Sequence, residues 1–353
     1  MRNSVRVSLS KSDRSFSVAP DRPVLGAALG AGLNLPHGCK GGNCGACRVR
    51  LLEGEVSYPN GRPLGLSDAE VADGFILLCQ ARAVSDLRIE AFELSAPGRS
   101  AIKRLPGRIV RSIPLSHDVL GVFLRLPPAE DFDFQPGQYI DVILPRGRRR
   151  SFSIASPPHD SRLLELHIRR VQGGEFTDPL FAGPDVHRER GMLLSIEGPL
   201  GQFVYRPADA PMLLVGGGTG LAPLKSIVRH VIENDLRRSM TLYWGVRSER
   251  DLYAQGELEE LMRRAPTFRY EAVLSEPSPA WVGRRGWVHE AVLQDFERLA
   301  ATDIYASGPP AMIAAVRSEF ALRGADPARL FFDSFDYAPD SLERQRTTAA
   351  TKS

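Results

Sequence analysis

Every cysteine of the chain falls in one spacing pattern that could hold an iron–sulfur cluster. Cys39, Cys44 and Cys47 form a C-x4-C-x2-C run, and Cys79 follows after a gap. With this spacing, four thiolates hold the two irons of a plant-type 2Fe–2S centre. Glycines within residues 38–45 permit the tight backbone that inward-pointing thiolates require, and N–H groups there can donate to the sulfurs. The pattern predicts a 2Fe–2S site with these four residues as ligands.

Three other interpretations of the cysteines are open: a zinc site, two disulfides, or scattered free thiols. Four thiolates could hold one zinc ion, although zinc sites usually contain paired C-x2-C knuckles, and only Cys44 and Cys47 form such a knuckle. Two disulfides would suit a secreted chain, but residues 1–5 lack the apolar core of a secretory signal. The iron–sulfur interpretation is favoured, and zinc is the main alternative.

A glycine-rich segment at residues 216–223 is the second feature with recognisable chemistry. It follows an apolar run typical of a buried strand and opens a helical pattern that continues to about Asn234. In that context, backbone N–H groups and the helix N-terminus attract a pyrophosphate, whereas the plain alternative is a tight turn. The spacing differs from the G-x-G-x-x-G dinucleotide fingerprint. The residues selected are Gly216, Gly217, Gly218, Thr219, Gly220 and Pro223.

Three domains in series are expected to position these features. Residues 1–96 combine alternating strands with a capping box at Ser67, which predicts a small α+β domain around the cysteines. A linker is expected at 97–103, and residues 104–208 contain many short strands with Gly and Pro turns, typical of an antiparallel β-barrel.

Residues 209–340 alternate strands with helices, which predicts a doubly wound parallel sheet. Helices are expected there near 257–264, 290–299 and 310–323. The polar residues 341–353 are expected to form a disordered tail. The fold class is therefore multidomain: α+β, then β-barrel, then α/β.

Composition narrows the function classes. At 353 residues the chain is long for one core, so two or three domains are expected. A net charge of +3 gives no case for nucleic-acid binding. No run approaches the ~20 apolar residues of a membrane span. Cluster-binding thiolates favour a reducing compartment, so we expect a cytoplasmic protein.

The first hundred residues resemble the ferredoxin family, whose β-grasp fold they would share. Farther along, Arg150-Ser151-Phe152-Ser153 resembles the R-x-Y-S signature of the ferredoxin–NADP reductase superfamily. The resemblance implies that Arg150 pairs with the flavin pyrophosphate, Phe152 lies against the flavin, and Ser153 hydrogen-bonds near flavin N5. Ser151 belongs to the same binding strand. Phe152 replaces the usual Tyr and so lacks one hydroxyl contact.

The segment from His167 to Thr177 resembles the second flavin-binding element of the same superfamily. There the resemblance implies that Gly173, Gly174 and Thr177 face the flavin phosphates, while His167 is an ordinary strand residue.

The glycine-rich segment in turn resembles the superfamily's G-G-x-G-x-x-P nucleotide loop. The adenosine ribose would then meet residues at the end of the next strand. Arg247 and Ser248 could hold a 2′-phosphate and favour NADPH, whereas Glu249 could bond the ribose hydroxyls and favour NADH. Family analogy favours NADH.

The nicotinamide end is expected near Ser307, Gly308 and Pro309, which resemble a C-G-P-P-x-M motif. Ser307 replaces the motif's Cys, so hydride transfer is expected to be slower. Phe335 resembles the C-terminal aromatic residue that shields the flavin face.

The whole chain to about residue 339 resembles reductase components of bacterial multicomponent oxygenases, and especially CDP-6-deoxyglucoseen reductase. The resemblance implies hydride transfer from NADH (or NADPH) to FAD, then single-electron transfer through the 2Fe–2S cluster to a partner protein. That partner is expected to be an oxygenase component or, alternatively, a deoxysugar dehydratase. A different class, a non-catalytic redox sensor or zinc-bearing flavoprotein, is the competing interpretation.

Overall fold

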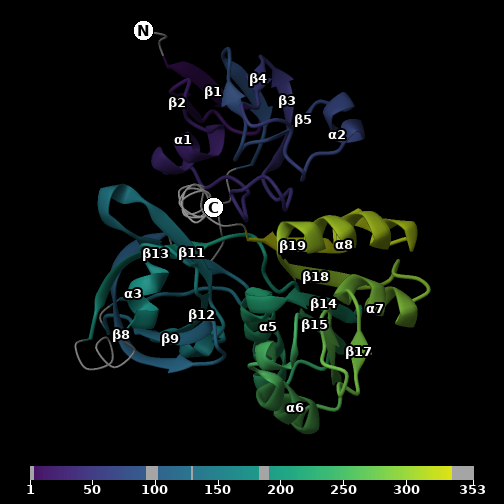
Figure 1. Ribbon diagram of the computed structural model, residues 1–353. Coiled ribbons are helices and arrows are strands. Elements are labelled where there is room, and N and C mark those ends of the chain that lie inside the picture. Colours follow the sequence, from purple (N-terminus) through teal and green to yellow (C-terminus); the bar gives the residue numbers. More distant parts are fainter. Residues whose placement is uncertain (1–3, 93–101, 129, 183–190, 336–353) are drawn as a thin grey trace, which may run out of the picture. The chain divides into compact units, whose positions relative to one another are not determined.

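The structure is a computed structural model that describes residues 4–92, 102–128, 130–182 and 191–335 (Figure 1). The predicted tail and most of the predicted linker lie outside these residues. The chain divides into two compact units, one formed chiefly by residues 1–98 and the other chiefly by residues 99–331. Each unit is described by itself.

The first unit is a mixed sheet with one helix packed on it. The sheet order is β2-β1-β7-β3-β5, with β1 antiparallel to β2 and parallel to β7. Val7, Phe16 and Val18 alternate with more exposed neighbours and are buried, so one face of the sheet forms the core together with α1. The elements are β1 (Val5–Leu9), β2 (Ser15–Val18), α1 (Val24–Gly30), β3 (Arg48–Glu53), β4 (Val56–Ser57), α2 (Asp68–Ala72), β5 (Phe75–Leu77), β6 (Arg82–Ala83) and β7 (Leu87–Glu90).

The capping box predicted at Ser67 is present. Glu70 N–H donates to the Ser67 hydroxyl at 3.3 Å, and the Glu70 carboxylate accepts from Ser67 N–H at 2.8 Å. These bonds satisfy backbone donors at the start of α2, which explains where this short helix begins.

The second unit begins with an antiparallel barrel. Its sheet order is β11-β10-β13-β8-β9-β12, and an antiparallel bridge between Ile154 and Leu166 joins the two outer strands and closes the sheet. Ile140, Leu166 and Ile196 are among the buried residues that fill its interior. The elements are β8 (Lys103–Pro114), β9 (Val119–Arg125), β10 (Tyr139–Ile143), β11 (Arg149–Ser153), β12 (Leu163–Arg169), α3 (Thr177–Ala182) and β13 (Leu193–Leu200).

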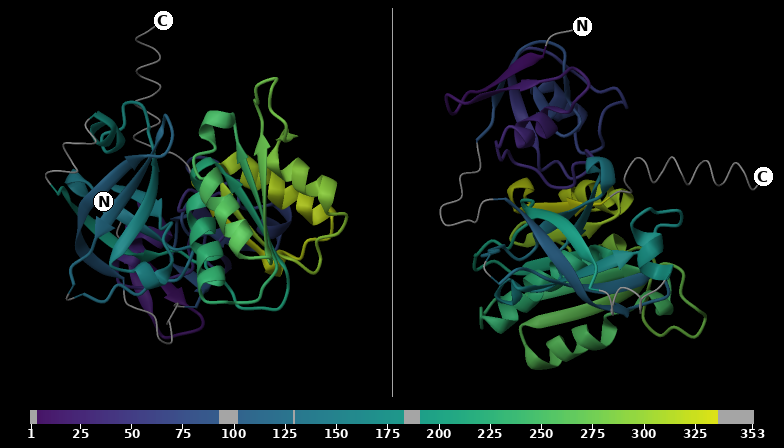
Figure 2. Two further views of the ribbon diagram at one scale, coloured as in Figure 1. Left: turned by 90° about the horizontal axis from the view of Figure 1, so that it is seen from below. Right: turned by 90° about the vertical axis from the view of Figure 1, so that its left-hand side faces the viewer.

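A six-stranded sheet with helices on both faces completes the second unit (Figure 2). Its order is β17-β16-β15-β14-β18-β19, and β14 pairs in parallel with both β15 and β18. The elements are β14 (Met212–Gly217), α5 (Leu221–Glu233), β15 (Met240–Val246), α6 (Gln255–Arg264), β16 (Phe268–Leu274), β17 (Arg284–Arg285), α7 (Val288–Asp295), β18 (Asp303–Gly308), α8 (Pro310–Leu322) and β19 (Leu330–Ser334). This is the predicted doubly wound arrangement.

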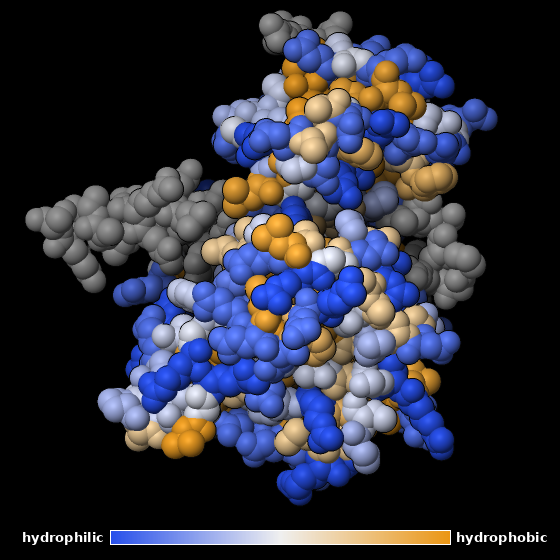
Figure 3. All heavy atoms as spheres, turned by 90° about the vertical axis from the view of Figure 1, so that its right-hand side faces the viewer, coloured by the Kyte–Doolittle hydropathy of each residue, from blue (hydrophilic) through white to orange (hydrophobic). Residues whose placement is uncertain are grey.

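Exposed apolar residues are scattered over the described surface. Val282 is 98% exposed, Leu64 70% and Trp287 61%. Figure 3 shows mainly hydrophilic side chains on the face that it presents. No helix within the described ranges combines the length and the apolar character that a membrane crossing requires.

Candidate functional site

The four cysteines meet because of how the first sheet is paired. Cys47 immediately precedes β3 and Cys79 lies just beyond β5, and these strands are antiparallel neighbours. The N–H of Leu78 donates to the Cys47 carbonyl at 3.2 Å, so the distant Cys79 is drawn to the cysteine loop. All four cysteines are free, and Cys44, Cys47 and Cys79 are buried.

The loop backbone leaves no room for side chains at two glycines. A Cβ on Gly38 would lie 3.0 Å from Cys44 Sγ, and one on Gly42 would lie 2.8 Å from Gln80 and Pro63. Gly42 also has a φ of +85°, which favours glycine. N–H groups already donate to sulfur: Cys39 N–H lies 3.3 Å from Cys44 Sγ, and Cys44 N–H lies 3.4 Å from Cys39 Sγ. Such donors stabilise charge on sulfur.

The sulfurs are arranged as two pairs. The Cys44 thiol donates to the Cys39 sulfur and lowers the pKa of Cys39 to about 6, while the same bond raises the pKa of Cys44. A second hydrogen bond, with Cys47, raises the pKa of Cys79. The Cys39–Cys44 pair therefore lies within the cysteine loop. The Cys47–Cys79 pair joins the residue before β3 to a residue just after β5.

This pairing distinguishes between one ion and two. Four sulfurs at about 2.3 Å from a zinc ion would lie about 3.8 Å apart in a tetrahedron. As a set, the cysteine sulfurs are farther apart than this. Among the described residues, the three potential metal ligands whose atoms all lie within 4.8 Å of one another are His117, Asp118 and Asp251, and no three cysteines form such a group. The four sulfurs therefore fit a two-iron centre, with one pair for each iron, rather than a single zinc ion.

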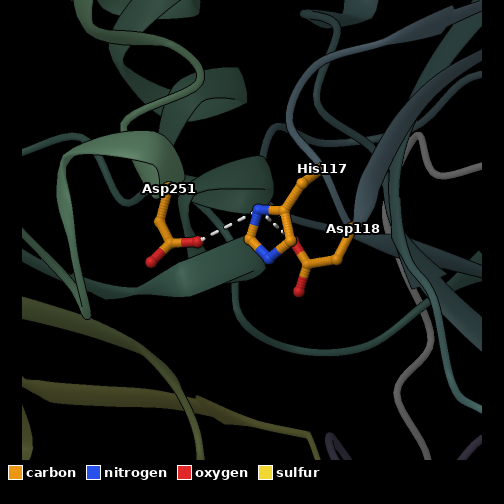
Figure 4. A group of neighbouring side chains, drawn as sticks. All are labelled: His117, Asp118 and Asp251. Carbon is orange, nitrogen blue, oxygen red and sulfur yellow. Dashed lines mark ion pairs between the residues drawn. The ribbon is translucent and has the colours of Figure 1, made fainter.

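The His117 group itself is already engaged. Figure 4 shows the His117 ring between the two carboxylates, 3.6 Å from Asp251 and 4.0 Å from Asp118. Asp118 also pairs with Arg169 at 3.3 Å, and Asp251 accepts from the Ser248 hydroxyl at 2.9 Å. His117, Asp118 and Asp251 are therefore occupied by ion pairs and hydrogen bonds where the barrel meets the nucleotide domain.

The predicted flavin strand is β11. Its register with β10 sets Ser151 opposite Asp141 and Ser153 opposite Tyr139. The Ser151 hydroxyl donates to Asp141 Oδ1 at 2.6 Å, and the Phe152 ring lies 5.5 Å from that of Phe176. Ser151 therefore braces the strand, while Phe152 presents a half-buried aromatic surface.

The arginine run before this strand divides into two groups. Arg148 pairs with Glu175, and Arg149 pairs with Asp141 and Glu197. Arg150 donates to the Arg149 carbonyl oxygen at 2.9 Å and is half-buried. The first two arginines thus hold the barrel together by ion pairs, and Arg150 remains the predicted pyrophosphate partner.

The second flavin element is a tight turn before α3. Gly173 has a φ of +74°, and its N–H donates to Asp178 at 2.8 Å. The Thr177 hydroxyl donates to the Val171 carbonyl and accepts from Val171 N–H, both at 3.0 Å. A Cβ on Gly174 would lie 2.5 Å from that hydroxyl. Thr177 therefore holds the turn closed.

The glycine loop fits a phosphate cradle in which no Cβ has room. Gly218 has a φ of +55°, and a Cβ on Gly217 would lie 2.7 Å from Met312 Sδ. The Trp244 indole N–H donates to the Gly218 carbonyl at 2.8 Å. Ser307 lies beside this loop, because β14 and β18 are parallel neighbours with Gly216 opposite Ser307. Residues 216–220 and 307–309 are thus brought together at the carboxyl edge of the sheet.

Three family descriptions match the chain in the order of its domains. They are the 2Fe-2S iron-sulfur cluster binding domain over residues 7–84, the oxidoreductase FAD-binding domain over 106–205, and the oxidoreductase NAD-binding domain over 214–318.

Relatives match over almost the whole length. CDP-6-deoxy-L-threo-D-glycero-4-hexulose-3-dehydrase reductase of Yersinia pestis is 34% identical and covers 94% of this chain and 98% of its own. The reductase component of propane 2-monooxygenase of Mycolicibacterium goodii is 33% identical, with coverage of 95% and 98%. The crystal structure of the Amycolatopsis cytochrome P450 reductase GcoB is 34% identical, with a TM-score of 0.74 and coverage of 94% and 99%.

The chain belongs to the ferredoxin reductase family of iron–sulfur flavoproteins. It is an NAD(P)H-dependent oxidoreductase whose three domains bind a 2Fe–2S cluster, FAD and the nicotinamide nucleotide. This confirms the predicted fold class, cofactors and enzyme class, and it removes the non-catalytic interpretation.

The predicted ribose end of the nucleotide site lies in the loop after β15. Ser248 donates to Asp251, and the Glu249 carboxylate accepts from Ser278 N–H at 3.0 Å. The hydrogen bond from the Ser278 hydroxyl lowers the pKa of Glu249. Arg247 is exposed. Glu249 is therefore held as an anion in the loop where a ribose is expected.

Phe335 is half-buried just beyond β19, and its role toward the flavin stays a prediction. Arg169, which no motif of the sequence marks as a site residue, lies beside the glycine loop: a Cβ on Gly218 would be 3.3 Å from its Nη1. Its position at the end of β12 was the available signal, but only the long-range packing of β12 against the loop brings this cation to the cradle.

Proposed function

We propose that this reductase takes hydride from NADH and delivers single electrons to the terminal component of a multicomponent oxygenase. The relatives named for propane 2-monooxygenase and for cytochrome P450 support an oxygenase partner. The anionic Glu249 supports NADH, because a carboxylate bonds ribose hydroxyls and repels a 2′-phosphate.

The predicted residues divide the work of binding and orienting. FAD, when bound, accepts two electrons from a hydride and releases them singly. Arg150 supplies a guanidinium to the pyrophosphate, Phe152 an aromatic surface and Ser153 a hydroxyl to the ring system. Residues 173–177 supply backbone groups near the phosphates. Each task suits the donor type that the position carries.

In the proposed nucleotide site, main-chain groups of the protein approach the nucleotide closely. The N–H groups of residues 216–220 cradle the pyrophosphate at the start of α5, with Pro223 in its first turn. Ser307, Gly308 and Pro309 shape the wall beside the nicotinamide. Arg247 and Ser248 line the ribose end, and Phe335 covers the flavin until nucleotide binds.

The observation that carries the proposal is the division of the four cysteine sulfurs into two pairs. A two-iron centre accepts one electron at a time, so it requires a one-electron acceptor downstream. Cys39 and Cys44 hold one iron, and Cys47 and Cys79 hold the other. The proposed domain boundaries are 1–96, 104–208 and 209–340, and the proposed location is the cytoplasm, where thiols stay reduced.

A second partner class has its own support. The Yersinia pestis relative is named as the reductase of a CDP-hexulose dehydrase, and its identity to this chain is one percentage point above that of the propane relative, 34% against 33%. A deoxysugar dehydratase is therefore the alternative electron acceptor.

Anaerobic titration followed by partner assays tests the proposal. The purified protein should show flavin and cluster absorption that NADH bleaches, and NADPH should act more slowly. Reduced protein should then drive substrate-coupled turnover by an oxygenase component, whereas turnover by a CDP-deoxysugar dehydratase alone would select the alternative. A colourless or NADH-inert protein would overturn both.

A further inference from the structure

Buried charged side chains join the barrel to the nucleotide domain within the second unit. Lys225, on α5, places its ammonium 3.0 and 3.1 Å from the two carboxylate oxygens of Glu165, on β12. Its third contact is the carboxylate of Glu257, on α6, at 2.7 Å. Lys225 is 3% exposed and Glu165 8%, so this ion pair is shielded from water where the two domains meet.

Hydrogen bonds extend the pair in one consistent direction. Burial raises the pKa of Glu165, but the hydrogen bond from His167 and the charge of Lys225 outweigh it and bring that pKa to about 2. The Glu165 carboxylate can therefore only accept, so His167 Nε2 carries a proton and donates at 3.1 Å. Burial lowers the pKa of His167, so the ring is neutral and Nδ1 accepts from the Tyr253 hydroxyl at 3.1 Å.

This hydrogen-bond network contacts residues next to both the proposed nucleotide site and the proposed flavin site. The Tyr253 ring packs edge-on against Trp244 at 5.0 Å, and Trp244 holds the Gly218 carbonyl of the glycine loop. Next to Lys225, the Ser226 hydroxyl donates to the Ser156 carbonyl at 2.8 Å, three residues beyond the flavin strand residue Ser153. The helix that begins at the glycine loop is thus fastened to the barrel within its second turn.

A buried ion pair is a poor source of net stability. Desolvation of the two charges offsets most of their attraction, and apolar replacements are often tolerated. The pair does, however, demand a defined geometry, because Lys225 without Glu165 would keep only the Glu257 carboxylate, and Glu165 without Lys225 would keep only the His167 hydrogen bond. Hydride transfer depends on such geometry, since a small misplacement of the reacting atoms slows it strongly.

We propose that the Lys225–Glu165 pair is a positioning element that fixes the glycine loop against the flavin-binding barrel and so sets the approach of nicotinamide to flavin. Neither residue touches the reacting atoms. The inference rests on the nucleotide and flavin sites proposed above, and it adds residues that those sites do not contain.

Three variants test this role in the full-length, FAD- and cluster-loaded protein. Lys225→Met removes the cation, and Lys225→Met/Glu165→Leu replaces the pair by an apolar one that should keep the fold. Arg238→Met is the matched control, because Arg238 is similarly buried but pairs with Asp303 and with the carbonyls of Arg206 and Ala210, none of which belongs to β11 or β12.

Anaerobic stopped-flow reduction by NADH, and by NADH deuterated at C4, gives the first readout. At saturating nucleotide, flavin reduction should slow roughly ten- to a hundredfold in both Lys225 variants. The isotope effect should change, and the dissociation constant for NAD⁺ should stay near that of the wild type. Arg238→Met should lower the unfolding midpoint yet keep the wild-type limiting rate.

Amide hydrogen exchange of the nucleotide-free protein gives the second readout. Exchange should rise together in β12 and α5 when Lys225 is replaced, and should not do so in Arg238→Met. A wild-type limiting rate in the folded double variant, or an equal loss in Arg238→Met, overturns the positioning role. An NADH-inert wild-type protein would instead refute the proposed function, and the exchange measurement would still decide whether the pair joins β12 to α5.

Discussion

Gly220 lies against the main chain of Ser307, so closely that a Cβ on Gly220 would stand 2.0 Å from the Ser307 carbonyl oxygen. This contact joins the end of the glycine loop to the end of β18. The two segments proposed to face the nicotinamide nucleotide therefore keep a fixed separation. Only glycine fits at position 220.

Gly220→Ala should abolish reduction of the flavin by NADH, because the new methyl group must push the loop away from β18. A destabilisation of about 1–3 kcal/mol is expected from the overpacking. Gly256→Ala is the matched control, since Gly256 lies in α6 with no neighbour within 4 Å of the new Cβ. That control should gain about 0.5–1 kcal/mol. Stopped-flow reduction and urea unfolding measure both effects, and an active Gly220→Ala protein would contradict the packing argument.

Cys44→Ser should separate the two halves of electron transfer. The variant should still reduce its flavin with NADH, because residues 216–220 and the barrel are unchanged. Transfer to cytochrome c or to the partner should fall to background, because Cys44 supplies one sulfur of a pair. Spectra of the cluster region and cytochrome c assays measure this. Unchanged transfer to a one-electron acceptor would show that electrons bypass the cluster.

Ser307→Cys should accelerate hydride transfer. The Ser307 side chain is fully buried beside the glycine loop. A softer, larger sulfur at this position would bring the wall of the proposed site closer to the nicotinamide. A barrier lower by about 1 kcal/mol would raise the limiting rate about fivefold. Ser318→Cys, on the exposed face of α8, controls for an added thiol. A slower Ser307→Cys enzyme would mean that the hydroxyl itself is the better neighbour.

Glu249→Gln should shift the nucleotide preference toward NADPH. Loss of the carboxylate removes repulsion of a 2′-phosphate, so kcat/KM for NADPH should rise about tenfold, which corresponds to about 1.4 kcal/mol. Glu276→Gln is the control, because Glu276 is an exposed carboxylate in the same region. Steady-state rates with both nucleotides measure the ratio. Equal ratios in the two variants would place the selecting group elsewhere.

Acid should weaken the second unit through His167. Burial holds the folded-state pKa of His167 below 6.5, so the unfolded chain takes up a proton first and the free energy of unfolding falls as pH drops below about 6.5. His167→Gln should flatten this slope without removing it, because burial also lowers the pKa of His230. Urea midpoints from pH 8 to pH 5, in the wild type and in His167→Gln, measure the slope.

Glu165 affects the stability of the second unit at a lower pH than His167 does. Its pKa of about 2 lies below the ordinary 4.5, so it contributes stability above pH 4.5 that is lost as pH falls toward 2. The shift corresponds to about 3 kcal/mol. Lys225→Met should move this loss to higher pH, because the charge that stabilises the carboxylate is gone. A variant with the wild-type acid profile would show that Lys225 does not control Glu165.

Local patterns predicted the sites whose chemistry lies within one segment. The cysteine spacing, the capping box at Ser67 and the start of α5 after Gly220 all depend on neighbours in sequence. The helix expected at 290–299 was wrong at both ends, since α7 runs from Val288 to Asp295. Its end depends on distant partners, because the Asp295 carboxylate is taken by Arg284 and Tyr243.

Long-range packing decided what the sequence could not. His167 is a strand residue, as expected, but nothing in its local pattern predicts a neutral ring between Glu165 and Tyr253. Arg169 and Lys225 likewise gain their neighbours only when β12, α5 and the glycine loop meet. The Thr177 hydroxyl, expected near phosphate, is directed at Val171 because the turn closes on itself.

The proposed iron ligand Cys79 lies 32 positions after Cys47, the ligand proposed to share its iron, because Cys47 precedes β3 and Cys79 follows β5. Metal insertion must therefore wait until this part of the chain has been synthesised and paired. The barrel and nucleotide domain contain none of the four cysteines, so they contribute no proposed ligand to the cluster. Loss of the cluster should consequently leave a flavin that NADH still reduces but that has no one-electron outlet.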